Sequence, residues 1–219
     1  MYNAKPPDYH KAARSAYRTL LATAADRLPI DIEAIVGCCQ NTHVLSYSAA
    51  YSLTGETFLG LRDGPSKLAM TIRRDADDET HYLIVWQDCV LDRRSGLYRF
   101  TLAHELGHIV LRHARGDSPA EEAEANCFAQ HLLCPRPALE AMRPTNYVDV
   151  SFACDVSYSV ARIAFAALHR EGHCVDRDMA DGIRQAFHLT DQRPIGDYVP
   201  RRCRSSWERE RVRVGPVLR

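Results

Sequence analysis

His104, Glu105 and His108 form an HExxH pattern, in which two histidines lie four residues apart and a glutamate follows the first of them. Residues four apart share one face of an α-helix, so both imidazoles can reach one metal ion. A carboxylate beside the first histidine can accept a proton from a water molecule at that metal. The pattern therefore predicts a metal site with hydrolytic chemistry.

The third protein ligand has several candidates. A catalytic zinc site usually has three protein ligands and one open position. His113 would give the spacing HExxHxxxxH, but the metzincin pattern requires glycine and histidine where this chain has Leu111 and Ala114. That class of metal site is therefore disfavoured. The alternatives are carboxylates at the start of the next predicted helix, namely Glu121, Glu122 and Glu124.

Helix geometry favours Glu122 among these carboxylates without deciding the matter. Glu122 and Asn126 lie four residues apart and share a helix face, so the carboxylate could bind metal while the amide holds a ligating histidine. Glu124 lies about 200° around the helix from Glu122, and both cannot face one metal. Glu121 is engaged elsewhere if it closes a capping box with Ser118.

Two helices must position these side chains. Residues 96–113 (GLYRFTLAHELGHIVLRH) have helical apolar periodicity and are followed by the turn residue Gly116. Ser118, Pro119 and Glu121 have the pattern of a capping box with proline at the first helical position. A second helix should therefore run from residue 119 until Pro135.

The N-terminal half predicts two more helices and a small sheet. Helices are expected over residues 9–27 and 31–37, the second capped by Asp31 and stopped by Gly37. Short runs rich in β-branched and aromatic residues then predict three or four strands, mainly antiparallel because the connections are short. These runs are VLSYSA (44–49), TFLGLR (57–62), LAMTI (68–72) and HYLIVW (81–86).

The C-terminal part is expected to be helical over 137–143 and over 148–171, with a break near 155–157. The end of the chain differs, because residues 199–219 contain seven arginines and two glutamates with little apolar pattern. We expect residues 1–175 to form one domain and residues 176–219 to form an extension with an Arg-rich tail.

Composition excludes several classes of protein. The 219 residues are 46% hydrophobic and 26% charged, as in globular proteins, and the formal net charge is zero. No apolar run is long enough to span a membrane, and the N-terminus has no apolar segment of a secretory signal. A cytoplasmic α+β protein with no membrane partner is expected.

Both metal-bearing helices resemble the ImmA/IrrE family of metallopeptidases. RFTLAHELGHIVLRH (99–113) matches the family's RFTLAHELGH helix, and EEAEANCFAQHLLCP (121–135) matches its ExxAN helix. The likeness extends more loosely to PIDIEAIV (29–36), to HYLIVW and to a helix-turn-helix-like segment within 148–171. The chain departs from the family at Cys134, where methionine is usual, and has no counterpart beyond about residue 175.

The resemblance implies a zincin-like metallopeptidase domain, with a small sheet packed on helices that include the HExxH helix. It implies that His104, His108 and Glu122 bind the metal, that Glu105 is the general base and that Asn126 matches the family's asparagine. This donor set suits zinc, with manganese as the alternative. Tyr98, His131 and Tyr147 are candidates for stabilising the oxyanion, and the edge of HYLIVW is a candidate for pairing with an extended substrate.

Family members commonly pair with a helix-turn-helix repressor, which implies such a repressor as the substrate in a stress, phage-defence or mobile-element response. The alternative is an antirepressor that sequesters the repressor and uses its metal for structure. Single-stranded DNA is a candidate activator, because Trp207 lies among the arginines of the tail. Cys89 precedes the HExxH helix and could block the metal's open position as an inhibitory thiolate.

Overall fold

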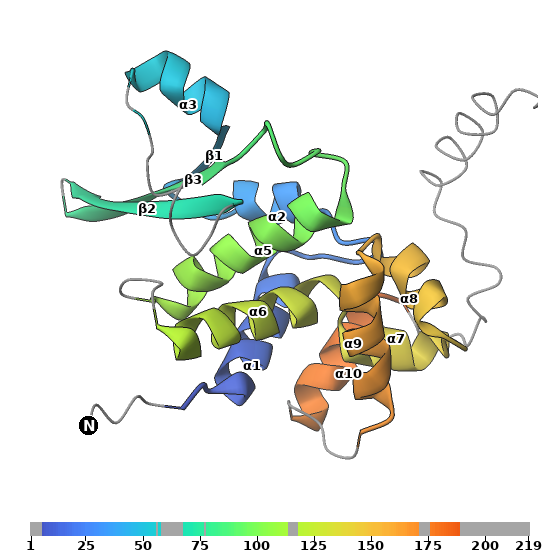
Figure 1. Cartoon of the computed structure of the whole chain (residues 1–219). Coiled ribbons are helices and arrows are strands. Elements are labelled where there is room, and N and C mark those ends of the chain that lie inside the picture. Colours follow the sequence, from blue (N-terminus) through green and yellow to red (C-terminus); the bar gives the residue numbers. More distant parts are fainter. Residues whose placement is uncertain are drawn as a thin grey trace, which may run out of the picture.

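A three-stranded sheet, the helix α5 (Gly96–Leu111) and the helix α6 (Pro119–Leu133) form successive layers, as Figure 1 shows. The computed structural model describes residues 6–55, 57, 68–76, 78–113, 118–170 and 176–188. α5 contacts the sheet on one side and α6 on the other, and α1 (Tyr9–Ala22) covers α6. The α+β architecture expected from the sequence is confirmed.

Aspartates cap the first two helices, and the cap expected at Asp31 is confirmed. The carboxylate of Asp8 accepts a hydrogen bond from the Lys11 N–H at the start of α1. Asp31 does the same for Ala34 in α2 (Ile32–Gly37). α1 ends at Ala22, five residues before the predicted limit at 27, because Ala24 adopts a left-handed conformation with φ of 51°.

The sheet has the order β1-β3-β2 and combines two kinds of pairing. β2 (Ala69–Ala76) and β3 (Glu79–Trp86) form the antiparallel pair expected from their short connection. β1 (Thr42–Ser46) instead pairs parallel with β3.

The run VLSYSA is a strand only up to Ser46. The hydroxyl of Ser46 accepts the Ala49 N–H and starts α3 (Tyr47–Thr54). The strand predicted at TFLGLR lies outside the described residues.

β3 is the central strand, since β1 and β2 occupy both of its sides. The prediction that HYLIVW offers its edge to a substrate is therefore wrong. Its apolar composition reflects burial in the middle of the sheet, where Ile84 and Val85 are fully buried. Among the described strands, β2 is the edge strand nearer the HExxH helix, because it contacts α5.

The two site helices begin in different ways. The hydroxyl of Ser95 accepts the Tyr98 N–H at the start of α5, and Arg112 ends this helix in a left-handed conformation. Pro119 occupies the first turn of α6 as predicted, but the Ser118 side chain makes no capping hydrogen bond. The predicted capping box is therefore wrong, and α6 starts on the backbone bond from Glu122 N–H to the Ser118 carbonyl.

The C-terminal helices are α7 (Arg136–Met142), α8 (Tyr147–Cys154) and α9 (Tyr158–Leu168). The break predicted near 155–157 is confirmed, because Asp155 is left-handed with φ of 52° and Ser157 caps α9. The buried guanidinium of Arg99 holds this turn against α5 by donating to the carbonyls of Cys154 and Asp155. The helix pair is thus fixed to the HExxH helix.

The helix α10 (Arg177–Ala186) packs against α1 and α7 and adds Ala180, Ile183 and Phe187 to the same hydrophobic core. This packing lies beyond the domain boundary expected at residue 175. The Arg-rich tail and Trp207 lie outside the described residues.

Within the described ranges, no single helix is both long and apolar enough to cross a membrane. Only α8 and α9 taken together, bent by 116°, have that length and composition.

A hydrogen-bonded chain joins α1 to α6 inside the core. The Arg136 N–H donates to the hydroxyl oxygen of Tyr17, whose own proton is then available to Nδ1 of His131, 2.9 Å away. The two rings also meet edge to face. Burial, followed by the charge of Arg136, lowers the pKa of His131 to about 4. His131 is therefore neutral at neutral pH and accepts the tyrosine proton.

We predict that this neutral histidine makes the fold sensitive to acid. The unfolded chain gains a proton at His131 below about pH 6.5 and the folded chain only near pH 4. Stability is therefore complete above pH 6.5 and falls by up to about 3 kcal/mol as the pH drops to 4. His131→Gln keeps an acceptor for Tyr17 without titrating. Urea unfolding of metal-free protein should show a flatter pH dependence for this variant.

The matched control is His43→Gln, since His43 is exposed on β1. This variant should keep the wild-type pH dependence. Equal slopes for wild type and His131→Gln between pH 6.5 and 4 would contradict the prediction.

Candidate metal centre

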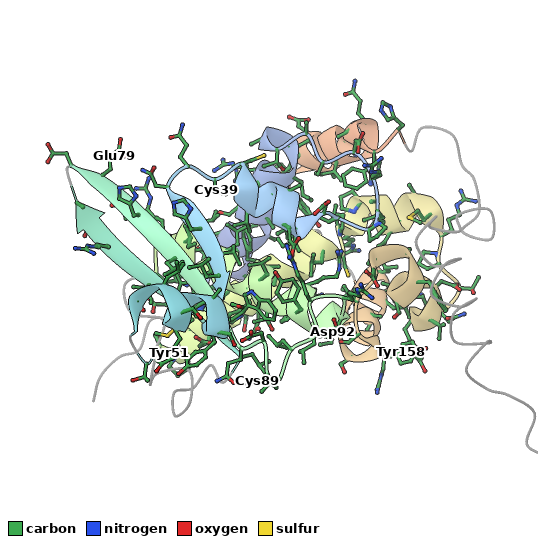
Figure 2. The ribbon with its side chains drawn as sticks, turned by 90° about the horizontal axis from the view of Figure 1, so that it is seen from above. Cys39, Tyr51, Glu79, Cys89, Asp92 and Tyr158 are labelled. Carbon is green, nitrogen blue, oxygen red and sulfur yellow. The ribbon has the colours of Figure 1, made fainter. Side chains whose placement is uncertain are left out.

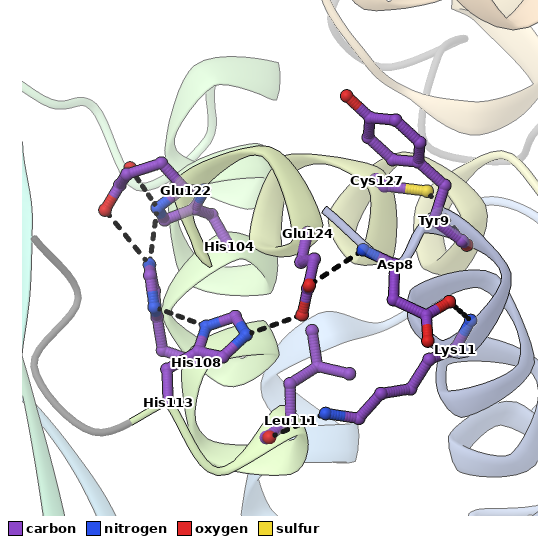
Figure 3. Close-up of polar contacts among 10 residues, drawn as sticks. All are labelled: Asp8, Tyr9, Lys11, His104, His108, Leu111, His113, Glu122, Glu124 and Cys127. Carbon is purple, nitrogen blue, oxygen red and sulfur yellow. Dashed lines mark hydrogen bonds and ion pairs between the residues drawn. The ribbon is translucent and has the colours of Figure 1, made fainter. Parts of the chain in front are cut away.

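His104 and His108 on α5 and Glu122 on α6 bring three ligand atoms together (Figure 3). The two Nε2 atoms of the histidines lie 3.0 Å apart. The carboxylate oxygens of Glu122 lie 3.3 Å from Nε2 of His104 and 3.4 Å from Nε2 of His108. Oε2 of Glu122 makes the contact with His104 and Oε1 the contact with His108, so the carboxylate spans both rings. One ligand atom from each residue lies within 4.8 Å of the other two, and together they form a triangle of ligand atoms.

This triangle has the size that a tetrahedral metal site requires. Three ligand atoms about 2.0–2.1 Å from a zinc ion in tetrahedral geometry lie about 3.3–3.4 Å from one another. The two Nε2 atoms, 3.0 Å apart, and the 3.3 and 3.4 Å from each of them to its nearer Glu122 oxygen are close to this spacing. The donor set of two imidazoles and one carboxylate also leaves a fourth position, as hydrolytic zinc sites do.

Two of the three groups are in the protonation state that metal binding needs. Burial and the charge of His104 lower the pKa of His108 to about 4, so this ring is neutral at neutral pH. The hydrogen bond to His104 lowers the pKa of Glu122, which keeps its carboxylate ionised.

His104 behaves differently. Burial disfavours its charged form, but the hydrogen bond to Glu122 and the charge of Glu105 outweigh burial, and its pKa is raised. Metal binding must displace a proton bound there, so affinity should rise with pH.

Asn126 lies one turn after Glu122 and contacts His104. Its Oδ1 is 3.0 Å from Nδ1 of His104. If Nε2 of His104 faces a metal, Nδ1 carries the proton and donates it to this amide oxygen. The contact has the geometry for orienting the ring, which is the role the sequence suggests for Asn126.

His113 and Glu124 form a second line of contacts that the sequence does not predict. Nδ1 of His113 lies 2.9 Å from Nδ1 of His108, and Nε2 of His113 lies 3.1 Å from Oε2 of Glu124 (Figure 3). Both residues were candidates for the third ligand by spacing alone. The structure places neither of them, nor Glu121, among the three grouped ligand atoms.

Glu105 is buried, with 3% of its surface exposed, and β2 supplies a partner for it. The hydroxyl of Thr71 donates to Oε2 of Glu105 over 2.7 Å. This contact fixes one carboxylate oxygen of the residue that the HExxH pattern assigns as general base. Thr71 carries no sequence signal of its own, because the contact depends on how β2 packs on α5.

Cys89 lies in the loop after β3, on the outer surface (Figure 2). It is exposed, and its thiol contacts the side-chain oxygen of Gln87. The group of metal-binding atoms found in the described residues contains His104, His108 and Glu122 and does not include this thiol. Its inhibitory role stays a prediction.

The three oxyanion candidates make contacts of other kinds. Tyr98 donates its hydroxyl proton to Glu33, and burial together with this bond raises its pKa. His131 accepts from Tyr17 in the core. Tyr147 is exposed and packs against Tyr158 on the surface of the helix pair.

Residues 68–167 match the family model described as the IrrE N-terminal-like domain of Peptidase M78. A comparison with curated proteins and one with solved structures gave no match. The matched segment contains the HExxH pattern, both helices that carry the triangle and the strand that contacts Glu105. The match supports the resemblance of these two helices to the ImmA/IrrE family of metallopeptidases.

Gly107, inside the HExxH pattern, allows α5 and α6 to approach closely. A methyl group at this position would lie 3.1 Å from Cδ1 of Phe128 and 3.2 Å from Cα of Ala125. Phe128 and Ala125 belong to α6, which also carries Glu122. The distance between the helices, and hence the size of the ligand triangle, depends on the missing side chain.

We predict that Gly107→Ala separates the two helices and loosens the site. Overpacking should cost about 1–3 kcal/mol of unfolding free energy, measured in urea on metal-free protein. Zinc affinity, measured by competition with a chromophoric chelator, should fall as well. Gly37→Ala is the control, because a methyl group there meets nothing within 4 Å. Unchanged zinc affinity in Gly107→Ala would contradict the prediction.

Proposed function

We propose that this protein is a metal-dependent endopeptidase that cleaves a helix-turn-helix transcriptional repressor in the cytoplasm. The observation that carries the proposal is the triangle of His104, His108 and Glu122 next to the buried carboxylate of Glu105. The peptidase family of residues 68–167 supports hydrolysis of a peptide bond. The choice of a repressor as the substrate is based on the resemblance to ImmA/IrrE members, which commonly pair with such proteins.

The residues divide the chemistry between them. A divalent metal held by His104, His108 and Glu122, with zinc the first choice and manganese the alternative, would supply a Lewis acid that polarises the scissile carbonyl. Glu105 accepts the proton of the attacking water and later donates it to the leaving amine. Thr71 holds the carboxylate of Glu105 in one orientation during both transfers.

The position of β2 suggests how an extended substrate is bound. Thr71 places β2 beside Glu105, and in the part of the chain that the structure describes the outer side of this strand is unpaired. A peptide segment could add to β2 through backbone hydrogen bonds, which are independent of the peptide's sequence. Such pairing would hold the scissile bond in the extended form that the site needs.

Single-stranded DNA is our candidate for the activating signal. Seven arginines and Trp207 between residues 199 and 219 provide positive charge and a stacking surface. Deletion of this segment should abolish DNA-dependent activation and leave basal cleavage unchanged. Equal activation with and without residues 199–219 would remove this part of the proposal.

The direct test is incubation of the purified protein with the repressor encoded beside its gene. Wild type, Glu105→Gln and wild type with chelator are compared, each with and without single-stranded DNA. Mass spectrometry identifies the fragments. Cleavage by wild type alone supports the proposal.

Sequestration is the rival outcome of the same test. An intact repressor that loses its operator DNA equally with wild type and Glu105→Gln would show an antirepressor instead, in which the metal serves structure.

We predict that Thr71 acts on the general base alone. Thr71→Val removes the hydrogen bond to Glu105 at nearly constant volume and should lower kcat/KM by on the order of tenfold. Thr71→Ser retains the hydroxyl and should recover most of this loss. Zinc affinity should be the same in all three proteins. A valine variant as active as wild type would show that the bond is dispensable.

A further inference from the structure

We propose that His113 and Glu124 are positioning residues that hold the metal ligand His108 in its binding orientation and anchor it to the N-terminus of α1. The proposal rests on the proposed function only in placing a metal ion between His104, His108 and Glu122. The contacts that carry it run from His108 to His113, then to Glu124 and finally to the backbone of Asp8.

The protons in this series of hydrogen bonds can be placed by counting donors and acceptors. A metal takes the lone pair on Nε2 of His108, so Nδ1 of that ring carries its proton. This proton points at Nδ1 of His113, 2.9 Å away, which must accept it. Nε2 of His113 therefore carries a proton and donates it to the Glu124 carboxylate at 3.1 Å. With a metal on Nε2 of His108, this arrangement of protons satisfies both contacts of His113.

The backbone after α5 places His113 beside His108. Arg112 turns left-handed with φ of 57°, and the His113 N–H then donates to the carbonyl of His108 over 3.0 Å. The two rings meet edge to face with centroids 4.9 Å apart. The His113 side chain is 4% exposed, so its contacts with His108 and Glu124 are shielded from water.

Glu124 connects this pair to α1. Its Oε1 accepts the Asp8 N–H over 2.8 Å, while the Asp8 carboxylate caps α1 through Lys11 N–H. The side chain of Lys11 donates to the carbonyl of Leu111 at the end of α5. The first turn of α1 is thus hydrogen-bonded to both site helices. It holds the carboxylate of Glu124, which in turn holds the ring of His113.

Outer contacts of this kind usually change metal affinity by about 10–100-fold when they are removed. A merely structural pair would instead lower the stability of the metal-free protein and leave its affinity unchanged. The two roles differ in a measurement that requires no substrate. Zinc affinity of the full chain, determined by competition with a chromophoric chelator, separates them.

Two substitutions of His113 form the central comparison. His113→Phe keeps the ring volume and removes both contacts, and we expect zinc affinity to fall 10–100-fold. His113→Gln offers an oxygen to His108 and an N–H to Glu124, and we expect its affinity to lie within about threefold of wild type, because both bonds can re-form. His43→Phe, on the exposed face of β1, should bind zinc as wild type does.

Glu124→Gln is the second variant and covers the case in which His113→Phe does not fold. A glutamine cannot accept from both Asp8 and His113, since one of its two polar atoms is a donor. In either orientation of the amide, one of the two contacts brings two hydrogen-bond donors together. We therefore expect zinc affinity to fall by about as much as in His113→Phe. Glu140→Gln removes another half-buried carboxylate, which binds Arg136 and Arg184, and should leave the affinity unchanged.

The proposal is supported if His113→Phe and Glu124→Gln weaken zinc binding and His113→Gln restores it. It is overturned if the folded phenylalanine variant binds zinc as tightly as wild type, or if the glutamine variant at 113 is as weak as the phenylalanine one. Glu105→Gln separates this result from the proposed function, because it should lose cleavage while it still binds zinc through His104, His108 and Glu122. A wild type that binds zinc but cuts nothing would remove the peptidase proposal and leave this one standing.

Discussion

Three ligand atoms from two helices have to meet within about 3.4 Å, and most of the structure serves this requirement. Two atoms come from one face of α5, where the HExxH spacing stacks His104 on His108. The third comes from Glu122 on α6, which approaches because Gly107 has no side chain. The sheet packs against α5 and α1 packs against α6, on opposite sides of this helix pair. The site is therefore a property of the helix contact and not of either helix alone.

Buried polar atoms impose the second constraint, because each must keep a hydrogen-bond partner. His104 has Asn126, His108 has His113, and Glu105 has Thr71. The partners come from β2, from the residues that follow α5 and from α6. Secondary-structure elements distant in sequence are thus tied to the same few side chains, and their packing sets the geometry of the chemistry.

The sequence predicts those parts of the molecule that local rules determine. Helical spacing places His104 and His108 together, and turn chemistry separates α8 from α9 at Asp155. The contacts of His113 and Thr71 are not predictable in this way, because they depend on how a left-handed residue redirects the chain and on how a strand packs over a helix. The central position of β3 also cannot be predicted from the sequence, because an apolar run has the same pattern in a central strand and in an edge strand.

X-ray absorption of the zinc-loaded protein tests the central claim most directly. We expect a first shell of nitrogen and oxygen at about 2.0–2.1 Å, with scattering from two imidazole rings and no sulfur. In Glu122→Gln the two imidazoles should stay while zinc affinity falls. A sulfur shell at about 2.3 Å, or a shell unaffected by replacing His104 and His108, would place the metal elsewhere and contradict a site made by these three residues.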